Sequence, residues 1–267
     1  MTPSRALVPG LALALALSLA LSLSASACGS DSGSGPGDGA DAGPDGDGNA
    51  GSVPAPFDPG QPYEPQVSAD DLSPEITNAF FPAPVGATWV YEAETDEGQG
   101  RIEVAALAGT ESVWGAEVRI LRDTESIDGE VIEDTRDWFA QDAAGNVWYM
   151  GEDTAEYEGG EVVSTEGSWT SGVDGALPGV QMLGDPQIGD EYRQEFFEGE
   201  AEDYGEVVSL DESVEVPAGS WTGCVRTRDR SVIEPDVEEF KTYCDGVGLV
   251  LEEEGDARVE LIEYTGL

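Results

Sequence analysis

From about residue 69 onward, apolar and polar side chains alternate along the chain with a period of two. Within residues 88–94, for example, Trp89, Tyr91 and Ala93 fall on one face, and the positions between them are mostly polar. Such alternation is typical of antiparallel strands with one buried and one solvated face. The pattern predicts a mainly β fold, with a single antiparallel β-domain over residues 69–267. Periodicity leaves a sandwich, a curved sheet and an open barrel as alternatives.

Departures from this alternation are few. Ser73-Pro74-Glu75 is a helix-start signal, so a short helix is expected within residues 69–79. Residues 153–188 are irregular and rich in glycine and proline. Long loops carry function more often than strands do, so a binding site should be lined by this segment.

A different hydrophobic pattern occupies the N-terminus. Arg5 is followed by apolar and small residues over positions 6–25, and the run ends in Ser26-Ala27-Cys28. A positive residue, an apolar run and small residues before a cleavage point are typical of a secretory signal. With its cysteine, the segment resembles a bacterial lipoprotein signal. The resemblance implies a signal peptide over 1–27, lipidation at Cys28, and anchoring in the cell envelope, at the outer membrane where the cell has one. Ordinary secretion and a retained membrane helix are the alternatives.

Residues 28–68 are rich in Gly, Ser, Asp and Pro. They contain too few apolar residues to offset the entropy of ordering, so we expect a disordered linker that holds the domain away from the membrane.

Two hairpins follow from turn chemistry. Asp142-Ala143-Ala144-Gly145 separates two aromatic-rich runs, and a four-residue loop there places Phe139 opposite Trp148. The next pair is then Trp138 with Tyr149. We interpret these aromatic residues as core that sets the strand register, with a ligand-stacking surface as the alternative.

The second hairpin involves the other two cysteines. A turn at Ile233-Glu234-Pro235-Asp236 places Arg230 opposite Glu238 and Cys224 opposite Cys244. In an oxidising compartment an even pair of cysteines favours a disulfide, so we predict the Cys224–Cys244 bond.

The charge balance limits the partners. The chain has 11 Lys and Arg against 56 Asp and Glu, a formal net charge of -45. Phosphate backbones and anionic headgroups repel such a chain, so we expect no nucleic acid partner and membrane contact only through the N-terminal lipid. An envelope protein or polysaccharide is the expected partner class. The acidic surface itself is best explained as a solubilising feature.

The residue types also limit the chemistry. With no histidine in 267 residues, Ser-His-Asp and Cys-His catalysis and imidazole-based zinc sites are excluded. Carboxylate chemistry remains, as in glycoside hydrolysis by two acids beside an aromatic cleft. The nominal candidates are Glu133, Asp134 and Asp137 near Trp138, and Glu195 and Glu198 near Phe196-Phe197.

We expect no cofactor, and calcium is the alternative that fits the composition best. Asp142, Asn146 and Asp153 supply the oxygen ligands that calcium prefers, although Asp and Asn in hairpin loops are usually turn formers.

Two stretches carry a further resemblance. The first comprises Asn78-Ala79-Phe80-Phe81-Pro82 with Val85-Gly86-Ala87-Thr88-Trp89. The second comprises Val216-Pro217-Ala218-Gly219-Ser220-Trp221 with Gly246-Val247-Gly248. They resemble a domain of unknown function found in bacterial secreted proteins and lipoproteins. The resemblance covers most of residues 76–254 and implies a β-rich envelope domain with no assigned activity. The leading hypothesis is therefore a lipid-anchored, non-catalytic binding or scaffolding module. A calcium-binding module and a carboxylate-dependent hydrolase are the alternatives.

The anchor can be tested directly. Cys28→Ser removes the lipid acceptor, so the protein should move from the membrane fraction to the soluble fraction after cell breakage. Ser30→Ala, two residues further on, should stay with the membrane. Unchanged partitioning of the Cys28→Ser protein would contradict lipidation.

Overall fold

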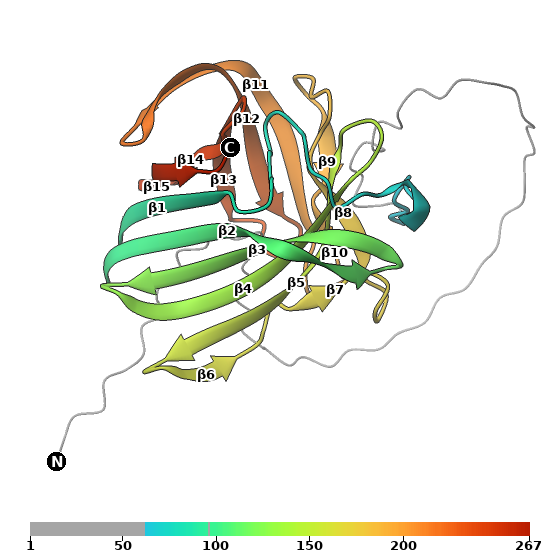
Figure 1. Ribbon diagram of the computed structural model, residues 1–267, viewed down its shortest axis with the longest axis horizontal. Helices are drawn as coiled ribbons and strands as arrows, with labels where there is room; N and C mark the ends of the chain where they lie inside the picture. The colour runs from blue at the N-terminus through green and yellow to red at the C-terminus, as the bar shows by residue number, and fades with distance from the viewer. Residues whose placement is uncertain (1–61, 96) are drawn as a thin grey trace, which may run out of the picture.

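The computed structural model describes residues 62–95 and 97–267, which form a 15-stranded antiparallel sheet (Figure 1). The elements in chain order are η1 (Ala69–Asp71), β1 (Thr88–Thr95), β2 (Gly98–Val113), β3 (Ala116–Ile127), β4 (Glu130–Gln141), β5 (Val147–Glu158), β6 (Glu161–Ser164), β7 (Trp169–Thr170), β8 (Leu177–Met182), β9 (Glu191–Arg193), β10 (Glu195–Phe196), β11 (Asp203–Val216), β12 (Gly219–Ser231), β13 (Glu238–Cys244), β14 (Gly248–Glu254) and β15 (Ala257–Thr265). Within the described part of the chain, no helix has the length and apolar composition that a membrane crossing needs.

The strand order is β10-β8-β5-β4-β3-β2-β1-β15-β14-β13-β12-β11-β9, with β6 and β7 beside β5. Most neighbours are consecutive hairpins. The pairing of β1 with β15 joins the first long strand to the last one, so the two halves of the chain form a continuous curved sheet.

Residues 191–196 close this sheet. In β9, Arg193 pairs with Tyr204 of β11, and two residues later, in β10, Glu195 pairs with Pro178 of β8. Because one short stretch of chain pairs with both edges, the sheet is a nearly closed, barrel-like structure. Gly179 permits this contact, since a Cβ at that position would lie 2.0 Å from the Gln194 carbonyl oxygen. The predicted antiparallel β-domain is confirmed.

Burial follows the alternation seen in the sequence. Along β1, Trp89, Tyr91 and Ala93 are buried, and the residues between them are partly exposed. On β4 and β5 both faces are covered, because consecutive residues belong to two different apolar clusters. Val67, Leu72 and Phe80 of the N-terminal segment pack against the second of these clusters.

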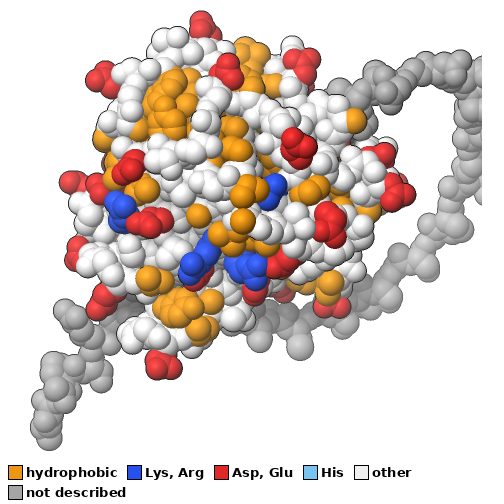
Figure 2. All heavy atoms as spheres, viewed as in Figure 1, with side chains coloured by type: hydrophobic (Ala, Val, Ile, Leu, Met, Phe, Trp, Pro, Cys, Tyr) orange, Lys and Arg blue, Asp and Glu red, His pale blue; other side chains and the backbone are white. Residues whose placement is uncertain are grey.

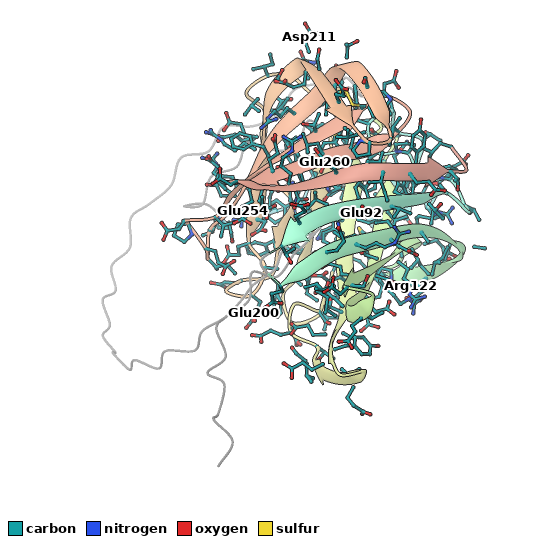
Figure 3. The ribbon with its side chains drawn as sticks, turned by 90° about the vertical axis from the view of Figure 1, so that its left-hand side faces the viewer. Glu92, Arg122, Glu200, Asp211, Glu254 and Glu260 are labelled. Carbon is teal, nitrogen blue, oxygen red and sulfur yellow. A yellow bond between two sulfur atoms is a disulfide. The ribbon has the colours of Figure 1, made fainter. Side chains whose placement is uncertain are left out.

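The outer face carries charged residues. Glu92, Arg122 and Glu260 lie on the outside of the sheet (Figure 3), in alternation with buried neighbours. Carboxylates are spread over the visible face, and its few basic groups lie beside them (Figure 2). Nine of the ten basic side chains in the described residues form ion pairs with acids. The tenth, Arg119, donates to the carbonyls of Leu107 and Gly109.

The register of the β4–β5 hairpin differs from the prediction by one residue. Phe139 pairs with Tyr149, and Gln141 closes the loop opposite Val147. The loop has five residues because the Asp142 amide donates to the Asn146 carbonyl at 3.0 Å. The predicted pairings of Phe139 with Trp148 and of Trp138 with Tyr149 were therefore wrong.

The helix expected within residues 69–79 is reduced to η1. Ser73 instead forms a β-bridge with Gln141, donating its N–H at 2.9 Å and accepting the Gln141 N–H at 2.8 Å. Pro74 disfavours the helical conformation in the residue before it, and the sheet satisfies the Ser73 backbone. The expected short helix is therefore present only as η1, and Ser73-Pro74-Glu75 does not start a helix.

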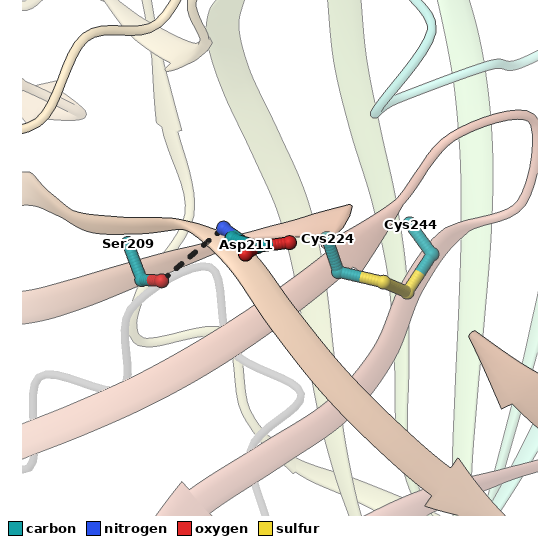
Figure 4. The surroundings of a disulfide bond; sticks show 4 residues. All are labelled: Ser209, Asp211, Cys224 and Cys244. Carbon is teal, nitrogen blue, oxygen red and sulfur yellow. Dashed lines mark hydrogen bonds between the residues drawn. A yellow bond between two sulfur atoms is a disulfide. The ribbon is translucent and has the colours of Figure 1, made fainter. Parts of the chain in front are cut away.

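The β12–β13 hairpin has the predicted register, with Arg230 opposite Glu238. Cys224 and Cys244 form a disulfide between the two strands, with Cα atoms 4.4 Å apart (Figure 4). Beside it, β11 is irregular, and the Asp211 amide donates to the Ser209 hydroxyl. The predicted disulfide is present.

Residues 62–68, which were assigned to the linker, contact the domain. The Tyr63 hydroxyl donates to the Pro178 carbonyl at 2.8 Å, and its ring lies 5.4 Å from that of Phe196. Contacts with the domain therefore reach back to Tyr63, within the segment expected to be linker. The predicted signal peptide, the predicted lipidation site at Cys28 and positions 28–61 of the predicted linker lie outside the described residues.

The disulfide joins cysteines 20 positions apart. Removing it in the double variant Cys224→Ala/Cys244→Ala should lower the free energy of unfolding by about 3 kcal/mol, mainly by freeing the unfolded chain. Urea titration without reductant measures this. Equal stability of the variant and the parent protein would contradict a stabilising bond.

Candidate functional site

Ionisable side chains occupy inward positions of several strands. Two residues after the buried Leu121 of β3 comes Asp123, and two before the buried Phe139 of β4 comes Asp137. Across the interior, β13 contributes Lys241 and β14 contributes Glu252. All four charged residues are 8% exposed or less. The curvature of the sheet therefore brings acids and the only lysine of the chain into one interior.

These residues line a cavity of about 70 Å³. Its wall has an apolar part and a polar part. The apolar part comprises Phe81, Pro82, Trp89, Tyr91, Val104, Leu121, Gly248 and Leu249, and the polar part comprises Asp123, Asp137, Gln181, Lys241, Tyr243 and Glu252. Phe81, Pro82 and Leu249 are only half-buried, so the wall approaches the surface beside them. A cavity of this volume has room for several waters or a small ligand group.

Lys241 lies among three carboxylates. Its Nζ is 3.1 Å from Glu239, 3.5 Å from Asp229 and 3.9 Å from Glu252. Burial acts to lower the pKa of Lys241, but the three carboxylates outweigh it and hold that pKa above its ordinary value. The lysine is therefore a permanent cation within the interior.

The remaining polar groups form short contacts along the same wall. The Tyr149 hydroxyl donates to Asp137 at 2.9 Å, and the Gln181 amide donates to the Tyr243 hydroxyl at 3.3 Å. The Tyr91 hydroxyl donates to the Leu249 carbonyl at 3.0 Å.

Three oxygen atoms on the cavity wall have no hydrogen-bond donor among the described residues. They are Oδ1 of Asp123, Oε1 of Gln181 and Oε2 of Glu252. Each belongs to a side chain more than nine-tenths buried. A buried acceptor without a donor costs about 1–3 kcal/mol, so these atoms require a partner in the cavity.

Burial perturbs the acids of the wall. It raises the pKa of Asp137 to about 7, with repulsion from Glu133 adding to the rise and the Tyr149 hydrogen bond opposing it. Burial also holds the pKa of Asp123 and that of Glu252 well above the ordinary range, although Lys241 opposes the effect at Glu252. Strongly perturbed carboxyls in a cavity are typical of functional sites.

Residues 76–84, which we call the strap, cross one end of the interior and contribute Phe81 and Pro82. Asn78 fixes the strap: its side-chain amide donates to the carbonyls of Gly145 at 2.8 Å and Leu183 at 3.0 Å. The Asn78 side-chain oxygen accepts the backbone N–H of Phe81 at 3.1 Å. One side chain thus ties the strap to two loops and shapes the turn that carries Phe81.

A row of aromatic rings continues from the strap into the interior. Phe81 contacts Phe139 at a ring distance of 5.0 Å, Phe139 stacks on Tyr149 at 5.0 Å, and Tyr149 meets Trp169 edge-on at 5.3 Å. Since Tyr149 also donates to Asp137, this row positions a cavity carboxyl.

The predicted metal ligands are only partly brought together. Asp142 accepts the Asn146 side-chain amide at 2.8 Å and the Trp148 indole N–H at 2.9 Å, which makes it the centre of the hairpin loop. Asp153 pairs with Arg136, which lies five positions along β4 from Gln141 at the hairpin loop. Five positions along a strand span roughly 17 Å, so Asp153 is far from the loop. Among the described residues, no group of three or more Asp, Glu or Cys side chains is arranged to hold a metal ion.

The acids named as candidates for glycoside hydrolysis also lie in different environments. Glu133 and Asp137 share the inner face of β4, whereas Asp134 points outward and is bound by Arg122. Glu195 is buried and interacts electrostatically with Glu152, whereas Glu198 is exposed. Trp138, Trp148 and Trp169 are buried in the apolar clusters, as the core interpretation predicts.

Sequence reasoning missed Asp123, Lys241, Glu252 and Gln181. A signal existed for the first three, because each lies two residues from a buried apolar or aromatic residue in the same strand, in phase with the inward positions. The irregular segment 153–188 contributes only Gln181 to the cavity wall.

No protein-family model matches this chain, and no curated protein matches it either. Among solved structures, a "putative lipoprotein" from Parabacteroides distasonis aligns with 70% of this chain and 99% of its own length, at 14% identity and a TM-score of 0.40. That level of similarity transfers no residue and no role.

The raised pKa of Asp137 predicts how stability depends on pH. Below about pH 7 the native protein binds a proton at Asp137 that the unfolded chain, with an ordinary pKa of about 3.9, does not bind. Acidification from pH 8 to 5.5 should therefore raise the contribution of this group by on the order of 2 kcal/mol.

Asp137→Asn, which keeps an acceptor for Tyr149, should flatten this part of the pH profile in urea titrations. Glu215→Gln, at an exposed position of β11, should leave the profile unchanged. A profile that keeps its slope in the Asp137→Asn protein would contradict the assignment.

Proposed function

We propose that this protein is an exported, lipid-anchored binding protein that takes a small molecule into the interior of its sheet without catalysing a reaction. The observation that carries the proposal is the set of buried acceptors without donors on the cavity wall, at Asp123, Gln181 and Glu252. Scaffolding on an outer surface would not need such an interior.

The shape of the wall supports a ligand site. Small-molecule sites are concave, mostly apolar, and contain a few convergent polar groups. Here Trp89, Tyr91 and Val104 lie on the apolar side, facing a polar side with three carboxyls. Water can satisfy the acceptors between binding events, and a ligand with suitable donors gains by displacing it.

The proposed location of the domain at the cell envelope is inferred from the N-terminal sequence. The lipid at Cys28 supplies the membrane contact, and the polar stretch that follows places the domain at a distance from the headgroups. An exposed binding domain on such a tether can collect a solute, or a terminal group of an envelope protein or polysaccharide, at the cell envelope.

The two alternatives lack a comparable observation. Calcium binding at Asp142, Asn146 and Asp153 would need the three side chains to converge, and glycoside hydrolysis would need two acids flanking an open cleft. Among the described residues, Asp142 is engaged by Asn146 and Trp148, and Asp137 is buried in the cavity wall.

The proposal is tested with four probes that share one aromatic ring and differ in charge: toluene, benzyl alcohol, benzoate and benzylammonium. At least one should give saturable heat in isothermal titration calorimetry and raise the melting temperature. Val104→Phe, which adds a ring to the cavity wall, should abolish this binding, and the milder Val104→Leu should weaken it.

Val131→Phe is the matched control, because Val131 is 43% exposed on β4 and lies outside the cavity. It should bind as the parent protein does. The proposal fails if no probe binds, or if binding persists in a folded Val104→Phe protein.

A further inference from the structure

We infer that the cavity selects an organic cation, an ammonium or guanidinium group joined to an apolar substituent. This inference rests on the proposed function and adds to it the chemical class of the ligand. Three properties of the wall carry it: the type of its free hydrogen-bonding atoms, its charge, and the division between its polar and apolar parts.

The free atoms on the wall are acceptors. Oδ1 of Asp123, Oε1 of Gln181 and Oε2 of Glu252 have no donor among the described residues. Ionised carboxylates and amide oxygens accept hydrogen bonds, so a ligand that matches the ionised wall supplies several N–H or O–H donors. An ammonium has three donors and a guanidinium has five, and neither has an acceptor that these oxygens would repel.

The charge of the wall favours a cation over a neutral donor. The wall has three acidic residues, Asp123, Asp137 and Glu252, and one basic residue, Lys241. That lysine is already shared with Asp229 and Glu239, which lie nearer to it than Glu252 does. Among the described residues, Asp123 and Asp137, on the other side of the cavity, form no ion pair with a cation, and a buried acid without one is stabilised by a positive ligand.

The apolar part of the wall distinguishes an organic cation from a metal ion. Trp89, Tyr91 and Phe81 present rings to the cavity, and rings suit an alkyl or aryl substituent and attract a cation by their π faces. Calcium instead requires six to eight oxygen ligands around it. The described residues contain no such grouping of acids.

Cation binding at this site should be coupled to the release of a proton. The groups facing Asp137 are Glu133 on its own strand, Asp123 on β3, Tyr149 and Glu152 on β5, and Lys241, Tyr243 and Glu252 across the cavity. A bound cation favours the ionised carboxyl, so Asp137 should release a proton when the ligand enters.

The test compares benzylammonium with benzyl alcohol, which has the same ring and no charge. Benzylammonium should bind at least tenfold more tightly at pH 7. Its affinity should rise about tenfold from pH 6 to pH 8, because a carboxyl that titrates near pH 7 ionises over this range. Calorimetry in buffers of different ionisation enthalpy should show net proton release.

Asp123→Asn keeps the shape of the wall and removes the charge that this acid acquires when a cation binds, so it should weaken benzylammonium by at least tenfold and leave benzyl alcohol within about twofold. Asp137→Asn should abolish most of the proton release. Glu215→Gln removes the same charge from the outer surface and should change neither affinity nor proton release.

The inference is overturned if toluene, benzyl alcohol or benzoate binds more tightly than benzylammonium, an outcome that leaves the proposed function standing. It is also overturned if calcium chloride titrates the same site with a dependence on Asp123. Absence of binding by all four ring probes would end both proposals together.

Discussion

The pairing of residues 191–196 with both β8 and β11 is the contact on which the rest of this molecule depends. An open sheet of this length would leave its concave face in water, and the side chains on that face would be solvated. Closure places them in a low-dielectric interior instead, where each polar group needs a partner. Tyr63 adds to the closure from the N-terminal side by bonding to Pro178 and packing on Phe196.

The interior thus created is costly in terms of stability. Burying Asp123, Asp137, Glu252 and Lys241 removes four ionisable groups from water, and a well-packed apolar interior of the same volume would commonly be at least as stable. Lys241 and its three carboxylates offset part of the cost, and the disulfide joins β12 and β13, which carry Lys241, Asp229 and Glu239. Local conflict with the rules of stable packing is expected at functional sites, and several of the buried groups in conflict here line one cavity.

Local chemistry predicted the fold where neighbours in sequence decide the geometry. The turn at Glu234 set the β12–β13 register and with it the cysteine pair. The β4–β5 register was missed by one residue because the Asp142 side chain draws Asn146 into the loop, an effect of side-chain contacts that turn length does not reveal. Of the cavity residues, only Asp137 was among the candidates. With 56 acids in the chain, composition alone cannot distinguish inward from outward carboxyls.

The sequence by itself determined an antiparallel β-domain, the paired cysteines, the acidic surface and the absence of histidine chemistry, because each depends on residue type or on spacing along the chain. Only the tertiary structure decided that the sheet closes, and that Asp123, Asp137, Lys241 and Glu252 from four strands meet around one cavity. Strand periodicity tells which side chains share a face. Which faces look at each other depends on curvature and on long-range pairing, and these arise only when distant strands come together.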